Sequence, residues 1–129
     1  MTASATGTFE VKVSPAPSEP AEVGRLTLDK QFHGDLEGTS QGTMLAHRTA
    51  VEGSAGYVAM ERVTGKLAGR KGSFVLMHLG VMNRGAQSLT ISVVPDSGTD
   101  ELAGLSGTME IIIEGRNHSY RFAYELPSR

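Results

Sequence analysis

The sequence predicts an all-β fold, a closed antiparallel β-barrel of eight strands, and three observations carry this prediction. Apolar and polar residues alternate over long stretches, which is typical of strands that bury one face. Glycine accounts for 16 of the 129 residues and mostly separates these stretches, as in short hairpin turns. Several stretches reach about ten residues, and hairpin-linked strands of that length lose their exposed edges by closing into a barrel. We therefore expect residues 1–129 to form a single β-barrel domain.

The eight strands are expected at residues 6–14, 22–33, 35–48, 56–67, 72–82, 86–95, 106–114 and 118–126. In order along the chain, the buried face of the regular strands is carried by Phe9, Val11 and Val13, then Leu26, Leu28 and Phe32, then Leu89, Ile91 and Val93, and finally Tyr120, Phe122, Tyr124 and Leu126. Glycines make the third strand less regular, since missing side chains permit tight coiling. In the break before residue 106, Thr99 is expected to cap one helical turn that Gly104 ends.

The fifth strand departs from simple alternation because both of its faces are apolar. One face carries Val75, Met77, Leu79 and Val81, and the other carries Phe74, Leu76 and Met82. Both faces are therefore expected to be buried, the outer one by a loop, by the N-terminal arm or by another subunit. About 400 Å² of apolar strand surface is unusual to leave in water, so we expect a homo-oligomer.

Composition argues against several classes of partner and chemistry. With 12 basic and 14 acidic residues the net charge is −2, and the only adjacent basic pair is Arg70-Lys71, so neither nucleic acid nor an anionic membrane surface is an expected partner. The absence of cysteine excludes disulfides, thiolate metal sites and thiol nucleophiles. No apolar run approaches the roughly 20 residues of a spanning helix, and the first residues lack the features of a signal peptide. We expect a cytoplasmic protein.

Four segments carry a family resemblance: TGTFEV at 6–11, FHGDLEG at 32–38, ERVTGKLAGRKGSFVLMH at 61–78 and VVPDSGTDELAGLSG at 93–107. They resemble the bacterial domain-of-unknown-function family 3224 (DUF3224), and the resemblance covers nearly the whole chain. It implies a calycin-like closed barrel similar to plant allene oxide cyclase, with a cavity that in related barrels holds an apolar substrate, and it implies no established activity. Two positions depart from the pattern, Met77 where a polar residue is expected and Ala68 where glycine is expected. No motif matches the catalytic residues of allene oxide cyclase, so catalytic residues stay unknown.

Glu61 and His78 are the sharpest candidates for a functional site. A hairpin that turns at residues 68–69 places Glu61 opposite Leu76 and diagonally next to His78, on one face. The other residues expected to bind a ligand on this face are Tyr57, Phe74 and Leu76. If this face is the lumen, burial raises the carboxyl pKa and a nearby imidazolium lowers it, so the pair can act as acid and base near neutral pH. Alternatively, the two side chains only satisfy each other within the core.

Weaker motifs have structural explanations. The GTSQG segment at 38–42 matches the G-x-S-x-G of hydrolases, but that motif requires a strand-to-helix turn at Ser40, and here the strand pattern continues. His33, Asp35 and Glu37 share a face, yet a metal site usually needs more than one imidazole, so no metal and no cofactor are expected. Arg48 and Arg62 could pair with a carboxylate at the barrel mouth, although Arg62 lies opposite in parity to Glu61.

The leading hypothesis is a barrel that binds a small apolar or amphipathic molecule in its lumen, with Glu61, His78 and Tyr57 as polar contacts. The first alternative is an isomerase or cyclase of the allene oxide cyclase kind. The second is a homo-oligomeric structural barrel with a filled lumen. An open lumen dotted with polar groups favours a ligand, and a solidly packed lumen favours the structural role.

Overall fold

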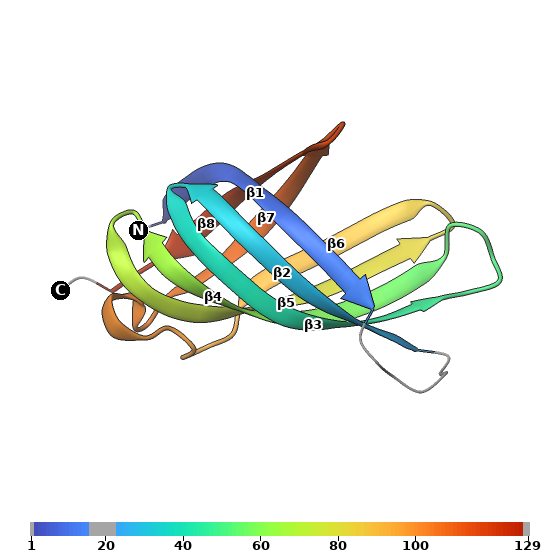
Figure 1. Ribbon diagram of the computed structural model, residues 1–129, viewed down its shortest axis with the longest axis horizontal. Coiled ribbons are helices and arrows are strands. Elements are labelled where there is room, and N and C mark those ends of the chain that lie inside the picture. Colours follow the sequence, from blue (N-terminus) through green and yellow to red (C-terminus); the bar gives the residue numbers. More distant parts are fainter. Residues whose placement is uncertain (1, 16–22, 128–129) are drawn as a thin grey trace.

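The computed structural model describes residues 2–15 and 23–127, which form a closed barrel in which each strand pairs antiparallel with the next and β8 pairs with β1 (Figure 1). Its strands are β1 (Ala3–Pro15), β2 (Gly24–Gly34), β3 (Leu36–Arg48), β4 (Ala55–Leu67), β5 (Arg70–Asn83), β6 (Ala86–Val93), β7 (Ser106–Glu114) and β8 (Asn117–Glu125). This confirms the predicted eight-stranded antiparallel barrel. No helix within the described residues is long and apolar enough to cross a membrane.

The β4–β5 hairpin has the predicted register, with Glu61 opposite Leu76. Its two turn residues, Ala68 and Gly69, both have positive φ, 49° and 83°. Two consecutive residues of this kind form the turn whose twist matches that of the flanking strands. The backbone N–H of Ala68 also donates a hydrogen bond of 2.9 Å to the carbonyl of Asp35, which ties the turn to the β2–β3 connection.

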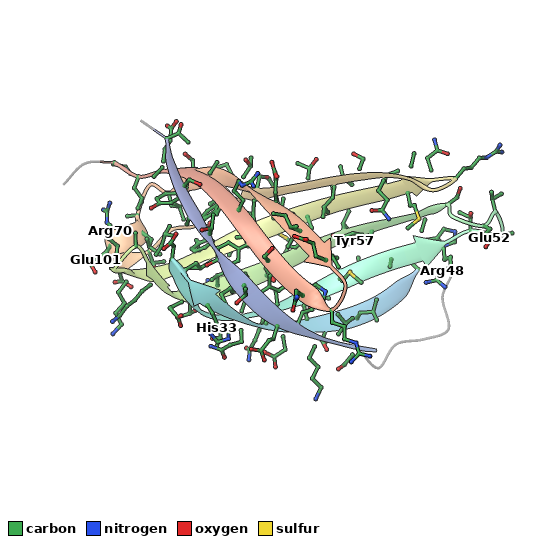
Figure 2. All side chains as sticks on the ribbon, turned by 90° about the horizontal axis from the view of Figure 1, so that it is seen from above. His33, Arg48, Glu52, Tyr57, Arg70 and Glu101 are labelled. Carbon is green, nitrogen blue, oxygen red and sulfur yellow. The ribbon has the colours of Figure 1, made fainter. Side chains whose placement is uncertain are left out.

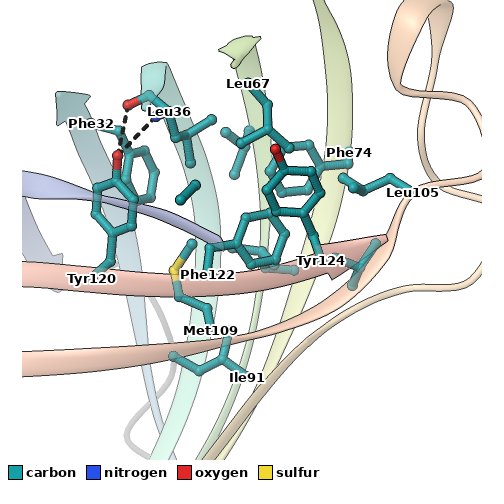
Figure 3. Packing of buried hydrophobic residues seen from close by; sticks show 14 of the residues in the cluster. Phe32, Leu36, Leu67, Phe74, Ile91, Leu105, Met109, Tyr120, Phe122 and Tyr124 are labelled. Carbon is teal, nitrogen blue, oxygen red and sulfur yellow. Dashed lines mark hydrogen bonds between the residues drawn. The ribbon is translucent and has the colours of Figure 1, made fainter. Parts of the chain in front are cut away.

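One half of the lumen is filled by packed side chains (Figure 3). Tyr120 lies in this packed half, and its hydroxyl accepts a hydrogen bond from the Leu36 N–H and donates one to the His33 carbonyl, both at 2.9 Å. The fully buried side chains around it come from most of the strands and include Phe32, Leu36, Leu67, Phe74, Leu76, Ile91 and Phe122. This end of the barrel is therefore closed to a ligand.

The segment between β6 and β7 covers the packed end. It buries Leu102 and Leu105, and it contains the short 3-10 helix η1 (Asp100–Leu102). The Thr99 hydroxyl accepts a hydrogen bond of 3.0 Å from the Ser73 N–H of β5 and makes no capping bond to η1. Thr99 therefore stands at the expected N-cap position of the turn, but its side chain makes no capping bond because it attaches the segment to β5.

The other half of the barrel is open along the line between β6 and β7. These two strands share a single register pair, Ser92 with Thr108, and beyond it the β7–β8 hairpin diverges from β6 (Figure 1). Two inward-facing residues expected to be buried are consequently exposed, Val13 at 47% and Leu89 at 45%, and the inward-facing Ile113 of β7 is exposed at 62%. The alternation gave their direction correctly, and the separation of the strands leaves them in contact with water.

The outer face of β5 is exposed, contrary to the expectation that both faces are buried. Met77, Leu79 and Val81 are 41%, 55% and 46% exposed. The described β6–β7 segment reaches only the first part of this face, where Thr99 bonds to the Ser73 hydroxyl and Ser97 to the Val75 N–H. The described part of the N-terminal segment is itself a barrel strand, β1. Burial of this surface therefore requires something outside the described residues.

Candidate functional site

The open half of the barrel contains a cavity of about 450 Å³. Inward-facing residues of β3 to β6 line it, among them Met44, Ala46, Tyr57, Met82 and Leu89. Arg48 stands at the mouth, at the end of the barrel opposite to Arg70 and Glu101 (Figure 2). None of the described residues that line the cavity is acidic. The cavity is therefore an apolar cup with a cationic group on its rim.

Tyr57 reaches the cavity because the facing position on β5 is a glycine. Tyr57 and Gly80 are register partners, and a Cβ atom on Gly80 would lie 2.1 Å from the Tyr57 ring. Only glycine, which has no Cβ atom, allows the Tyr57 ring to pack directly against the β5 backbone at this position. The ring centroid of Tyr57 is 6.3 Å from that of His78, which lies one layer deeper in the barrel.

Beneath Tyr57, four polar side chains form a buried cluster around Glu61. The Lys30 Nζ and His78 Nε2 atoms lie 3.1 and 3.2 Å from Glu61 Oε1, and the Ser40 hydroxyl donates a hydrogen bond of 3.0 Å to Oε2. The four residues are exposed by only 1–6%. Gly42, the register partner of Glu61, has no side chain to occupy this space. Four inward positions on β2 to β5 thus build one compact ionic cluster.

Glu61 is ionised in this cluster at neutral pH. Burial would raise the pKa of its carboxyl, but the hydrogen bond from His78 and the charge of Lys30 outweigh burial and leave the pKa below its ordinary value. An ionised carboxylate can only accept hydrogen bonds, so His78 Nε2 carries the hydrogen that it shares with Glu61. The Lys30 ammonium also lies 5.3 and 5.8 Å from the ring centroids of Phe9 and Phe32, within the range of cation–π attraction.

The Tyr57 phenol is protonated over the physiological range. Burial raises its pKa, and the negative charge of Glu61 raises it further. Tyr57 therefore offers a neutral O–H group to the cavity.

The comparisons with known proteins agree with this barrel. The family model described as "Protein of unknown function (DUF3224)" matches residues 5–124, which span all eight strands. The chain belongs to the DUF3224 family. A crystal structure of a DUF3224 protein of unknown function from Shewanella oneidensis MR-1, at 1.84 Å resolution, shares 49% sequence identity with this chain. The alignment covers 100% of both chains, with a TM-score of 0.92. The search of curated proteins finds no match.

The five residues predicted to bind a ligand lie at different depths of the DUF3224 barrel. Tyr57 lines the open cavity, and His78 and Glu61 lie directly beneath it. Phe74 and Leu76 lie in the packed half, where the Phe74 ring stacks on Phe122 at 5.9 Å. The structure therefore brings together the three polar candidates. Leu76 lies beside Glu61 as its register partner, where the packed half begins, and Phe74 lies deeper in that half.

Lys30 and Ser40 are the members of the cluster that sequence reasoning missed. The signal was present, because Lys30 falls between Leu28 and Phe32 on the inward face of the second strand, and Ser40 is in phase with Leu36. A lysine on an apolar face needs a buried partner of opposite charge. Glu61 is that partner.

The other candidates of this DUF3224 chain have ordinary structural roles. The 38–42 segment lies within β3, so it does not form the strand-to-helix turn of a hydrolase. His33 pairs with Glu10 at 3.0 Å, while the carboxylates of Asp35 and Glu37 each accept a backbone N–H. No group of three or more potential metal ligands occurs among the described residues. The Arg62 guanidinium lies on the outer face, 3.5 Å from the Ser73 hydroxyl.

Proposed function

We propose that this protein binds a small apolar or amphipathic molecule in the open half of its barrel. The observation that carries the proposal is the exposure of inward-facing apolar side chains, 45–62% for Val13, Leu89 and Ile113, against 0% for Phe32 and Leu36 in the packed half. Covering such surface is favourable by roughly 25 cal/mol per Å². The cavity of about 450 Å³ is within the size range of small-molecule sites.

The polar groups around the cavity favour a ligand with one polar part. The Tyr57 hydroxyl is a neutral donor on the wall, and Arg48 is a cation at the mouth with no acidic residue lining the same cavity. The charges of Lys30 and Glu61 are paired beneath the floor. An amphipathic molecule would place its apolar part between Met44, Leu89 and their neighbours and keep its polar part near the wall or the rim.

A cavity-filling substitution tests this proposal. We expect Ala46→Trp to abolish binding of an amphipathic dye such as 1-anilinonaphthalene-8-sulfonate, because Ala46 lines the cavity and an indole would occupy it. Val51→Trp is the matched control, since Val51 lies in the β3–β4 loop and is 47% exposed. Native mass spectrometry of the protein purified from its own host should show a co-purifying small molecule that is missing from Ala46→Trp. Equal dye binding by both variants would contradict the proposal.

One observation favours a second candidate, the isomerase or cyclase alternative. Glu61 holds His78 through Nε2, so the Nδ1 atom of a neutral imidazole is left as a proton acceptor. Both side chains are almost fully buried, however, and Tyr57 separates them from the cavity, so binding is the better-supported function. The two functions differ in what co-purifies. If the protein only binds, the same molecule co-purifies with the wild type and with the His78→Gln variant. If the protein is an enzyme, the variant accumulates unconverted substrate, whose structure differs from that of the molecule bound to the wild type.

The third alternative, a barrel that is only structural, requires a lumen filled along its length. The described lumen is filled at one end and lined by exposed apolar residues at the other. This asymmetry supports a ligand rather than a scaffold.

A further inference from the structure

The outer surface of β3, β4 and β5 carries an uncharged apolar patch, formed by Leu45, Val58, Met60, Met77, Leu79 and Val81. Each of these side chains is 41–55% exposed. Strand register aligns most of them in two neighbouring rows that continue onto β6, Leu45-Val58-Leu79-Thr90 and Thr43-Met60-Met77-Ser92. A groove of about 670 Å³ runs between the rows, and neither row contains a charged residue. The face is thus a ridged apolar sheet surface.

We infer that this patch packs against the same patch of a second copy of the chain, in a two-fold symmetric dimer. Six half-exposed large side chains present on the order of 500 Å² of apolar surface, which is near the upper end of the largest patch on a typical monomer, and such patches often have a function. That area is more than half of the roughly 800 Å² that each partner buries in a standard stable interface. The outer patch can therefore supply the core of a dimer interface, with the polar ends of its rows as the rim.

The chemistry of the patch fits a copy of itself. At a two-fold axis the same surface meets itself, so a charged residue near the axis would face its own charge. The two rows avoid this because their only polar members are Thr43, Thr90 and Ser92. Ridged sheet faces also pack on each other, with the rows of one sheet entering the grooves of the other.

A membrane fits the patch less well. Segments that bind membrane surfaces combine apolar residues with several lysines or arginines and with aromatic side chains at the interface. The patch contains none of these residue types, and the chain carries a net charge of −2 with no tryptophan. The inference does not depend on the proposed ligand, since Val81 is the one patch residue that also lines the cavity and the other five do not.

Sedimentation equilibrium of the wild-type protein at tens of micromolar tests the inference. We expect twice the chain mass of 13.7 kDa. Leu79→Glu should raise the dissociation constant of the dimer by at least about 30-fold, because the substitution buries a carboxylate in the interface, close to the same carboxylate of the second copy. Val51→Glu is the control, since Val51 has similar exposure but lies in the β3–β4 loop, and its dimer should be unchanged. A wild-type mass of one chain, or a dimer that persists in Leu79→Glu, would overturn the inference.

Cross-linking gives a second readout that does not depend on a charged substitution. The chain has no cysteine, so Leu79→Cys and Val51→Cys each introduce a single thiol. A short bis-maleimide should give covalent dimers of Leu79→Cys in clear excess over Val51→Cys. If Leu79→Cys gives no more covalent dimer than Val51→Cys does, the proposed dimer is contradicted. Wild-type binding to phosphatidylglycerol vesicles that Leu79→Glu abolishes would assign the patch to a membrane and would also overturn it.

Discussion

Glu61 of β4 accepts hydrogen bonds from side chains on three other strands, β2, β3 and β5, and its charge is the only one that balances Lys30 in the described lumen. Breaking a buried ion pair by removing one partner costs about 3–5 kcal/mol, because the remaining charge stays desolvated. Replacing both partners with apolar residues of similar volume is often neutral. The cost of losing Glu61 therefore depends on whether Lys30 is still present.

We predict that Glu61→Gln lowers the free energy of unfolding by about 3 kcal/mol or more. The double variant Lys30→Met with Glu61→Leu should recover most of this loss, since no unpaired charge remains in the barrel. Urea unfolding monitored by circular dichroism measures both. If the double variant loses as much stability as the single one, the ion pair is not the source of the cost.

The lowered pKa of Glu61 makes stability depend on pH in a defined direction. The unfolded state has the ordinary carboxyl pKa, near the reference value of 4.5, and it takes up the proton at a higher pH than the folded state does. The contribution of Glu61 is therefore fully present above that value and is lost as the pH falls through the folded pKa. We expect the free energy of unfolding to fall more steeply below pH 4.5 in wild type than in Glu61→Gln, measured by urea unfolding at several pH values. Parallel pH profiles would contradict this.

At the scale of elements, the β4–β5 turn contains strain that the sequence marks as a departure from the family pattern. Ala68 has a φ of 49°, where its Cβ crowds the backbone, whereas glycine adopts this conformation freely. We predict that Ala68→Gly raises the free energy of unfolding by about 0.5–1 kcal/mol, because relief of strain exceeds the added entropy of the unfolded chain.

The neighbouring turn position is the matched control. Gly69 has a φ of 83°, and no atom lies within 4 Å of the place where a Cβ would stand. Gly69→Ala should therefore lose about 1 kcal/mol through backbone conformation alone. Thermal unfolding of the two variants should shift in opposite directions, and a shift of both in the same direction would show that the turn changes type.

The strands themselves were predictable from the sequence because strand period and turn chemistry are local. Alternation gave all eight strands, and the turn at Ala68 fixed the register that places Glu61 beside His78. Alternation does not say how far along the barrel axis a residue lies. Phe74 therefore shares a face with Tyr57 in the sequence pattern but lies in the packed half, while Tyr57 lies in the open half. That position depends on strand tilt, which only the closed barrel defines.

At the scale of the whole molecule, the barrel is closed at one end and split at the other. β6 is paired with β5 along its full length, from Ala86 to Val93, but with β7 only at Ser92. The sequence could not show this split, since residues 86–95 and 106–114 each have the pattern of a complete strand. Whether β6 and β7 stay paired depends on the course of the long β6–β7 connection and on the twist of the β5–β6 and β7–β8 hairpins.

We predict that the split is visible by amide hydrogen exchange. About half of the N–H groups of residues 86–91 point away from β5 and lack a β7 partner, so they should exchange rapidly. The amides of β4, which has a paired strand on each side over its whole length, should be strongly protected. Equal protection in β4 and β6 would mean that the split is closed in solution.

The pairing of β1 with β8 has a consequence for how the chain folds. Every other neighbouring pair in the barrel joins strands that follow each other along the chain, whereas this one brings Ala3 next to Tyr124. Hairpins form within microseconds, but a contact across more than a hundred residues must first meet the entropy cost of closing that loop. We therefore expect the β1–β8 ladder to form last. Until it does, Ala5 and Phe122, which face each other across it, remain in water, and the chain is most prone to aggregate during that interval.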